Sequence, residues 1–350
     1  MTTATHDSRS PVDPDDILIR VDALNKHYPM RSMKLFGSEK SAIKAVNGVS
    51  FQISRGETLG LVGESGCGKS TTGRVVLRLE EPTSGEVWFD GIDLATLDAE
   101  SLRMIRKRMQ VVFQDSADSL NPRMSTGRTI AEPLRIYEMG TDAEIKQKVA
   151  DLMELVGLNP AWVRRFPHEF SGGQRQRINI ARALAIDPDF IVLDEPISAL
   201  DVSIQAQVVN LLADLQARLG LTYLFIAHDL AMVRHISDRI AVMYLGRIVE
   251  TADANALFEE PLHPYTQALI SAVPLADPKT ERTRIPIVLE GEVPSPGNLP
   301  AGCVFHPRCP QAVERCRTEV PEFREFTPGR FVACHLVDEA GSHVVERRGL

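Results

Sequence analysis

The chain opens with two segments in which apolar and polar residues alternate, residues 17–24 and 42–53. Period-two alternation predicts half-buried β-strands, and the segment PMRSMKLFGSEKS between them predicts a hairpin loop or an insertion. Residues 57–63 then form a short apolar run that ends in glycine, and helix-forming residues follow from Lys69. A strand, a glycine-rich turn and a helix in this order form the phosphate-binding βα unit.

Helices and buried strands alternate through the next part of the chain. Residues 98–158 are rich in helix formers and predict a mostly helical insert, with breaks at Asn121-Pro122 and Glu132-Pro133. From Gly173 to residue 228 the pattern is a helix, a buried strand, an amphipathic helix and a second buried strand. This alternation predicts an α/β fold with a largely parallel central sheet.

Composition and charge narrow the class of protein. The chain has 350 residues, 43% of them hydrophobic, and a net charge of −8, which argues against bulk binding to nucleic acid or to an anionic membrane. Its most apolar run, residues 219–227, is far shorter than the roughly 20 residues of a spanning helix. The polar N-terminus lacks the apolar core of a signal peptide and predicts a disordered tail. The predicted organisation is a tail (1–15), a main α/β domain (16–258, with a helical part at about 98–180) and a proline-rich, loop-rich extension (259–350).

The glycine-rich turn carries the first chemical signature. GESGCGKS fits the phosphate-loop pattern G-x-x-x-x-G-K-[ST] and lies between a predicted strand and helix. Backbone N–H groups of such a loop curl around phosphate oxygens. Lys69 is expected to reach the β- and γ-phosphates, and Ser70 to ligate Mg²⁺. The predicted nucleotide-binding residues here are Gly63, Glu64, Ser65, Gly66, Cys67, Gly68, Lys69, Ser70 and Thr71.

Two further patterns accompany this loop. Asp194 and Glu195 end a buried strand, where ligands bind in parallel α/β sheets. Asp194 would hold Mg²⁺ through its water shell, and Glu195 would polarise the attacking water. Ser171 precedes two glycines at the start of a helix, which predicts a second anion-binding helix N-terminus. The spacing leaves open whether that second site serves the same nucleotide or one bound by another subunit.

Taken together, the phosphate loop, SGGQ, LDEP, SALD and a histidine after the next strand occur in the order found in ABC transporter ATPases. The chain resembles this family over about residues 17–258. The resemblance implies a P-loop NTPase with an N-terminal antiparallel β subdomain, a parallel-sheet core and a helical subdomain. It also implies a head-to-tail dimer, in which the signature of one subunit acts on the ATP of the other. The residues that would do so here are Ser171, Gly172, Gly173 and Gln174.

The same resemblance assigns roles to four more residues. Tyr28 would stack on adenine, and Gln114 would sense Mg²⁺ or water and couple to the membrane subunits. Asp201 would communicate across the dimer, and His228 would contact the γ-phosphate. Core or capping roles are the alternatives for each. Ile197 departs from the smaller or hydroxylated residue often found at its position, which carries no catalytic role.

The C-terminal region resembles the extension of oligopeptide and dipeptide importer ATPases, particularly the subunit usually encoded second of the pair. The resemblance rests on PLHPYTQALISAVP, on FQDSADSLNPRM and on DVSIQAQVVNLL. His263 could be a metal ligand, but beside Pro264 it is predicted to be a turn residue that packs the extension onto the core. This reading implies two permeases, a homologous second ATPase and an extracytoplasmic binding protein as partners, at the cytoplasmic face of a membrane.

Four of the five cysteines crowd into the extension. Five, six and seventeen residues separate Cys303, Cys309, Cys316 and Cys334 in turn. Four thiolates in a loop-rich segment suit a stapling metal. Related peptide importers carry a four-iron, four-sulfur cluster on a matching pattern, which implies such a cluster here. Structural zinc and reduced thiols are the alternatives, and Cys67 is predicted to be structural.

The leading hypothesis from the sequence is an importer ATPase that binds ATP and Mg²⁺ and drives uptake of short peptides. Alternatives keep the transporter and change the cargo to sugars, nickel, glutathione or an antimicrobial peptide. A soluble ABC ATPase of translation or DNA repair is a further alternative, but the chain has neither two cassettes nor a long coiled-coil insertion. No predicted residue contacts solute, so cargo, direction and pairing partner stay open.

Overall fold

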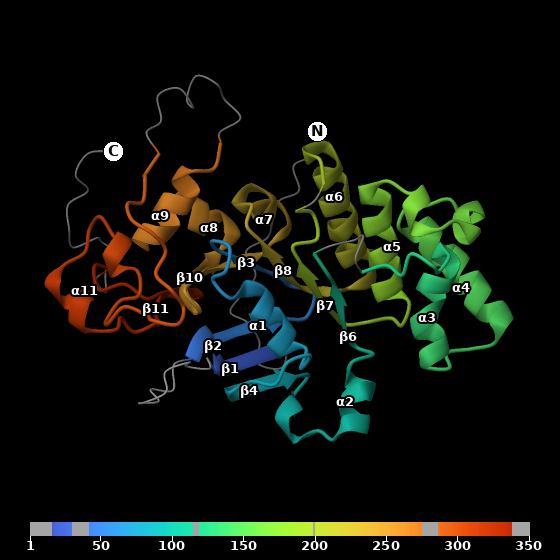
Figure 1. Ribbon diagram of the computed structural model, residues 1–350, viewed down its shortest axis with the longest axis horizontal. Helices are drawn as coiled ribbons and strands as arrows, with labels where there is room; N and C mark the ends of the chain where they lie inside the picture. Colours follow the sequence, from blue (N-terminus) through green and yellow to red (C-terminus); the bar gives the residue numbers. More distant parts are fainter. Residues whose placement is uncertain (1–15, 30–41, 115–118, 199, 275–285, 338–350) are drawn as a thin grey trace, which may run out of the picture.

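The structure is a computed structural model that describes residues 16–29, 42–114, 119–198, 200–274 and 286–337. The predicted N-terminal tail, residues 1–15, lies outside the described residues, and so does most of the segment predicted as a hairpin loop or insertion. The remainder forms two sheets with helices around them (Figure 1).

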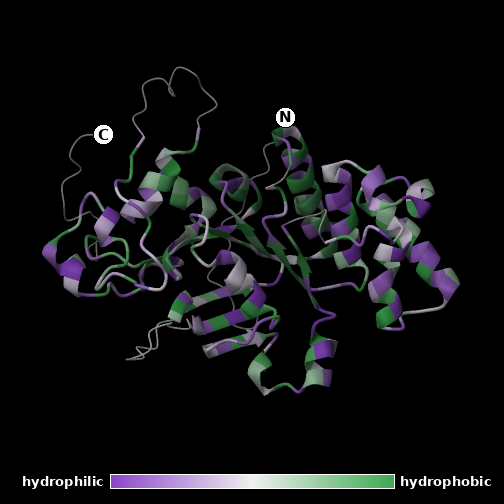
Figure 2. Cartoon of the chain, in the orientation of Figure 1, coloured by the Kyte–Doolittle hydropathy of each residue, from purple (hydrophilic) through white to green (hydrophobic). Residues whose placement is uncertain are grey.

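Within the described residues the larger sheet has eight strands, and five neighbouring strands that extend to one edge of it run parallel. These parallel strands are mostly apolar and buried, which is the pattern of a parallel sheet covered on both faces. Figure 2 shows them as the most hydrophobic part of the chain. Their order across the sheet is β9 (Arg239–Tyr244), β3 (Thr58–Val62), β8 (Thr222–Ala227), β7 (Phe190–Asp194) and β6 (Met109–Val112).

The smaller sheet is antiparallel and comes from the N-terminal part of the chain. Helix α1 (Lys69–Val76) contacts strands of both sheets, so it joins them. The fold class is therefore confirmed, including the antiparallel subdomain and the parallel core. The strands of this sheet, in order, are β2 (Ala42–Ser54), β1 (Ile17–Pro29), β4 (Ser84–Phe89) and β5 (Ile92–Asp93).

The predicted helical insert forms at one end of the molecule (Figure 1). One detail of the prediction is wrong: Pro133 lies inside a helix and does not break it. A proline removes one hydrogen bond, to the carbonyl oxygen four residues earlier, so the disturbance is confined to the turn from Thr129 to Pro133. Ile130 and Leu134 are fully buried on either side of the proline, and this packing outweighs the local cost. The helices of this part are α2 (Ala99–Ile105), α3 (Thr126–Ile136), α4 (Asp142–Leu155) and α5 (Gly172–Leu184), with the 3₁₀ turns η3 (Pro160–Arg164) and η4 (Pro167–Glu169).

Two helices cover the parallel sheet between its later strands. Helix α6 (Val202–Leu219) ends at Gly220, whose left-handed φ of 66° makes it the C-cap. Helix α7 (Leu230–Ile236) follows β8, and Asp229 caps it by accepting hydrogen bonds from the N–H groups of Ala231 and Met232.

The described part of the extension continues the main sheet. Strand β10 (Arg247–Asp253) pairs antiparallel with β9 on one side and with β12 (Arg330–Val332) on the other. Strand β11 (Arg324–Thr327) then forms the sheet edge. The helices of this region are α8 (Ala254–Glu259), α9 (Pro264–Ser271) and α11 (Glu314–Thr318), with the 3₁₀ turn η5 (His306–Arg308).

A buried glutamate fastens the start of α9 to the sheet. The Glu250 carboxylate, fully buried on β10, accepts hydrogen bonds from the backbone N–H of Leu262 (2.8 Å) and of His263 (2.9 Å). Burial raises the pKa of Glu250. His263 caps α9 by accepting the N–H of Tyr265 at Nδ1, and its ring packs against Phe305. His263 therefore has the packing role that the sequence predicts for it.

Glu250→Ala should loosen the extension. It leaves two buried N–H donors without acceptors, which costs about 3 kcal/mol in the free energy of unfolding. Urea denaturation and limited proteolysis of the extension measure this. Glu319→Ala, which removes only the exposed ion pair with Arg315, is the control and should leave both unchanged. Equal protease resistance of the Glu250 variant and the wild type would contradict the anchoring role.

Candidate functional site

The site is built around the phosphate loop, residues 63–70, which joins β3 to α1 and includes the first two residues of that helix. Gly68 is the N-cap of α1 with a left-handed φ of 109°, and a Cβ there would lie 2.0 Å from the carbonyl oxygen of Ala45. Only glycine fits so close to that strand in that conformation. The loop thus curls tightly ahead of a helix N-terminus, where phosphate groups bind readily.

Lys69 lies across this loop. Its side chain is buried, and its Nζ donates to the carbonyl oxygens of Gly63 (2.8 Å) and Glu64 (3.0 Å). The ammonium group is therefore held inside the curl formed by the backbone. Its role at the β- and γ-phosphates stays a prediction.

A hydroxyl and a carboxylate meet beside the loop. Ser70 Oγ donates to Asp194 Oδ1 at 2.7 Å, and Asp194 ends strand β7. Burial is the main reason that the pKa of Asp194 is raised. Mg²⁺ in nucleotide sites usually takes only a few protein oxygens and completes its shell with water and phosphate. The Ser70–Asp194 pair fits this ion, and a bound cation would favour the ionised carboxylate.

Three strand ends bring together the predicted catalytic residues. Glu195 Oε2 accepts a hydrogen bond from Gln114 Nε2 at 2.9 Å and lies 3.6 Å from His228 Nδ1. These residues follow β7, β6 and β8, which are neighbours in the sheet. Glu195 has a positive φ of 46°, and its N–H donates to Ile226 O at 2.9 Å. The turn thus places the largely buried Glu195 carboxylate between the Gln114 amide and the His228 imidazole.

The signature residues form the start of α5. Ser171 is the N-cap, and its backbone N–H donates to Gln174 Oε1 at 3.0 Å in a capping box. Gly173 packs against α6, because a Cβ would lie 2.4 Å from Ile204 Cγ2. Gly172 lies close to Leu200, and Ser171 itself is exposed. Close packing therefore explains why glycine stands at positions 172 and 173. Ser171 is exposed, so the helix N-terminus is accessible to a partner.

Tyr28 and Asp201 lie at two further predicted positions. The Tyr28 hydroxyl donates a hydrogen bond to the Glu80 carboxylate and also interacts with the Thr71 side chain. The Tyr28 ring centroid lies 5.0 Å from Lys26 Nζ. Tyr28 is therefore next to the phosphate loop, and its stacking on adenine stays a prediction. Asp201 is the exposed N-cap residue of α6. Its role across a dimer also stays a prediction.

The four cysteines of the extension are free thiols in one neighbourhood. Burial above all raises the pKa of Cys334 to about 12, and the charges of Cys303, Cys309 and Cys316 raise it further. Burial likewise raises the pKa of Cys309 to about 11. Within the described ranges, however, no three His, Cys, Asp or Glu side chains are arranged to hold a metal ion. The described residues therefore do not support the predicted cluster.

Cys67 lies in the phosphate loop, away from this group in the sequence. Its side chain is buried, and burial raises the pKa of its thiol. These features agree with the structural role predicted for it.

Sequence reasoning missed two residues at the site, Arg308 and Tyr265. Both come from the extension, and both contact Glu64 of the phosphate loop. Tyr265 stands in a quoted motif, but nothing in that motif indicates its partner. A contact between residues 244 positions apart leaves no local pattern in the chain.

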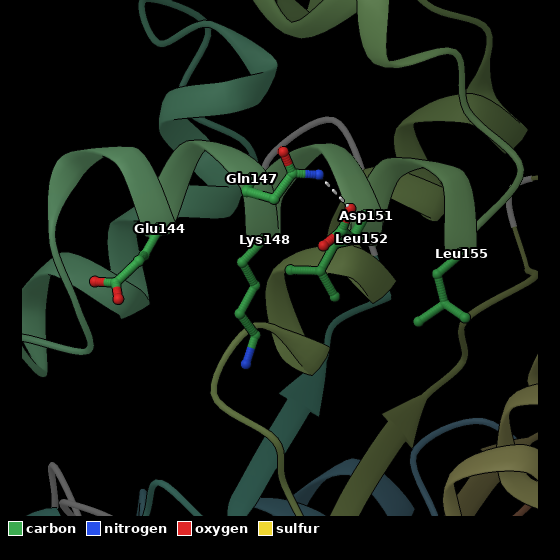
Figure 3. A pocket seen from close by; sticks show the side chains of 6 residues that line it. All are labelled: Glu144, Gln147, Lys148, Asp151, Leu152 and Leu155. Carbon is green, nitrogen blue, oxygen red and sulfur yellow. Dashed lines mark hydrogen bonds between the residues drawn. The ribbon is translucent and has the colours of Figure 1, made fainter.

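A hollow of about 480 Å³ lies elsewhere, along the outer face of α4 (Figure 3). Glu144, Gln147, Lys148, Asp151, Leu152 and Leu155 line it, all from that one helix, and Gln147 donates to Asp151 at 2.8 Å. The predicted catalytic residues are not among them.

Comparison with known proteins identifies the family of this chain. Residues 46–198 match the family model of the ABC transporter, and residues 249–316 match that of the oligopeptide/dipeptide transporter C-terminal region. The oligopeptide transport ATP-binding protein AppF of Bacillus subtilis is 53% identical over 92% of this chain and 98% of its own length. The chain belongs to the ATP-binding subunits of ABC transporters, in the oligopeptide/dipeptide branch, and is an ATPase.

Solved structures give the same fold. The dimeric ATP-binding cassette MJ0796, bound to ADP and Pi in a post-hydrolysis state, is 30% identical with a TM-score of 0.60. It covers 68% of this chain, and the match spans 99% of the cassette. The cbiO1 protein of Clostridium perfringens is 26% identical with a TM-score of 0.61, over 70% of this chain and 92% of its own.

The helices in the described part of the chain are all too short or too polar to span a bilayer.

Ser70→Ala should weaken the use of magnesium more than the binding of nucleotide. It removes the hydroxyl that pairs with Asp194, so the Mg²⁺ concentration for half-maximal ATPase should rise on the order of tenfold or more. A magnesium titration of ATPase activity measures this, with the exposed Ser84→Ala as control. If the magnesium concentration for half-maximal activity were unchanged in Ser70→Ala, Ser70 would not be a magnesium ligand.

Proposed function

We propose that this chain powers the uptake of di- and oligopeptides by hydrolysing ATP in a head-to-tail pair of ATPase subunits. The observation that carries the proposal is the position of the Glu195 carboxylate, between Gln114 and His228 and one residue beyond the Asp194 that pairs with Ser70. A base for water and one oxygen for Mg²⁺ thus lie at the end of β7, and Ser70 of α1 supplies the second oxygen.

Each group has a distinct task in this proposal. The N–H groups of residues 63–70 and the Lys69 ammonium bind the phosphates. Ser70 and Asp194 hold Mg²⁺, which neutralises charge on the phosphates. Glu195 orients and polarises the attacking water, Gln114 fixes the Glu195 carboxylate, and His228 contacts the γ-phosphate. Tyr28 stacks on the adenine.

The second half of each site comes from a partner subunit. Ser171, Gly172, Gly173 and Gln174 of one chain bind the ATP held by the other, and Asp201 lies at the contact between them. Two features support this: Ser171 is exposed at a helix N-terminus, and a structural neighbour is a dimeric cassette. ATP closes the pair, and hydrolysis reopens it.

The complete assembly has four membrane-associated chains and a binding protein. Two permeases span the membrane, and this chain and a homologous, non-identical ATPase bind them from the cytoplasmic face. An extracytoplasmic binding protein delivers the peptide. Two similarities support peptides as cargo: the extension matches the oligopeptide/dipeptide transporter C-terminal region, and the relative AppF is an oligopeptide transport ATP-binding protein. The same match disfavours a soluble ATPase of translation or DNA repair.

We also propose that Cys303, Cys309, Cys316 and Cys334 bind a four-iron, four-sulfur cluster. Support comes from their shared neighbourhood and from the charge coupling that raises the pKa of Cys334. A cluster binds each thiolate at a different iron, so its four ligands stand farther apart than those of one ion. Structural zinc and reduced thiols are the alternatives to this cluster.

Glu195→Gln should keep ATP binding and slow hydrolysis by on the order of 10²-fold or more, because it removes the base. A strain lacking the gene should lose uptake of a labelled dipeptide or oligopeptide, and this variant should fail to restore it. Asp201→Asn is expected to retain binding and a measurable rate. Wild-type turnover by the Glu195 variant in the assembled transporter would refute the assigned base, and normal uptake in the deletion strain would refute peptide import.

Anaerobically purified protein should contain about four iron and about four sulfide ions per chain. Cys309→Ser or Cys316→Ser should lose this iron and its visible absorbance, whereas Cys67→Ser, in the phosphate loop, should keep both. Elemental analysis and absorbance measure these. About one zinc per chain, or no metal at all, would reject the cluster.

A further inference from the structure

The extension reaches back to the phosphate loop and holds one residue of it. Glu64 donates its backbone N–H to the Tyr265 hydroxyl at 2.9 Å. Its carboxylate accepts two hydrogen bonds from the Arg308 guanidinium, 2.8 Å from Nη1 to Oε2 and 3.1 Å from Nη2 to Oε1. This is the two-pronged geometry in which arginine binds carboxylates most strongly.

The pair is shielded from water. The Arg308 side chain is 8% exposed, and that of Glu64 is 27% exposed. Tyr244 lies beside the guanidinium, whose centre is 6.0 Å from the ring centroid. The hydrogen bonds to Glu64 raise the pKa of Arg308. A cation this buried depends on its partner, because losing one member of such a pair leaves a charge without compensation.

Arg308 has little freedom to move away. It ends η5, where its N–H donates to Phe305 O at 3.0 Å. Phe305 packs against Tyr244 and Tyr265, with ring centroids 5.2 and 5.4 Å away, and all three aromatic side chains are fully buried. Cys303 and Cys309 flank this turn. The guanidinium is therefore presented by a packed aromatic cluster that is part of the main core.

Glu64 is also tied to the group that binds phosphate. Lys69 Nζ donates to the Glu64 carbonyl oxygen at 3.0 Å, so the position of this peptide sets where the ammonium lies. A carboxylate in a phosphate-binding loop repels the triphosphate unless it is neutralised. Arg308 neutralises it, and Tyr265 fixes the N–H of the same residue.

We propose that Arg308 and Tyr265 are positioning residues for the phosphate loop, through which the C-terminal extension of this chain sets the affinity of its own ATP site. The inference rests on the proposed binding of ATP by residues 63–70. It gives the extension a role within the subunit, separate from any contact with permeases.

The test measures ATP hydrolysis by the assembled transporter as a function of ATP concentration. Arg308→Met should raise KM for ATP on the order of tenfold, because an unneutralised carboxylate faces the phosphates. It should leave kcat within about twofold, because the variant weakens the binding of bound ATP and of the transition state by the same free energy. Arg308→Lys keeps the charge without the paired geometry and should give an intermediate KM.

A double variant separates positioning from simple loss of structure. Glu64→Gln with Arg308→Met removes both charges and should bring KM back to within about threefold of the wild-type value. If Arg308 served only to hold the fold, the double variant would be at least as impaired as the single one. Equilibrium binding of a non-hydrolysable ATP analogue to the full-length chain should follow the same order.

Arg330→Met is the matched control. Arg330 is also a shielded arginine of the extension, 13% exposed, and pairs with Glu260 at 3.2 Å. Its removal should leave KM unchanged. A wild-type KM in Arg308→Met and Arg308→Lys, or an equal rise in Arg330→Met, would overturn the inference while wild-type hydrolysis still upholds the ATPase. A wild-type transporter that neither bound nor hydrolysed ATP would overturn both.

Discussion

The structure depends on one close approach of backbone to backbone, where the loop after β3 turns into α1. The chain must reverse there within a few residues and still leave N–H groups free for an anion. Gly68 makes this possible, because a side chain would collide with the carbonyl oxygen of Ala45. The same curl brings the Gly63 and Glu64 carbonyl oxygens to the Lys69 ammonium. Strand β3 sits between β8 and β9 at the sheet centre, so the loop starts from the best-supported part of the fold.

The rest of the site follows from the parallel order of the neighbouring strands. Because parallel strands all end at one edge, residues distant in the sequence meet there without long connections. Asp194 thus reaches Ser70, and Gln114 and His228 both reach Glu195. The extension approaches from the other side, anchored by Glu250 and by the pairing of β10 with β12. In this way one loop receives groups from the parallel core and from the extension.

Local pattern was enough to predict the phosphate loop and the strand that ends in Asp194 and Glu195, because each combines regular structure with a chemical signature. The antiparallel subdomain and the helical part followed from the resemblance of the ordered motifs to a known family. The predicted helix break at Pro133 is wrong, since the helix continues through it. The proline's low helix propensity does not reveal that Ile130 and Leu134 beside it are buried. The addition of β11 and β12 to the main sheet, and the pairing of Arg308 with Glu64, depend on tertiary contacts that short motifs do not contain. The four-iron, four-sulfur cluster comes from the resemblance to related importers; the described side chains form no metal site, so the cluster stays a proposal.

The central claim is that this chain holds only half of each working ATP site. The most direct measurement is ATPase activity of the full-length chain at low concentration while the homologous ATPase subunit, with the permeases, is added in increasing amounts. The account predicts almost no turnover by the chain alone and a rise that saturates at about one partner ATPase per chain, because the partner must supply the signature that completes this chain's ATP site. Full turnover by the dilute, unpaired chain, unchanged by its partners, would contradict it.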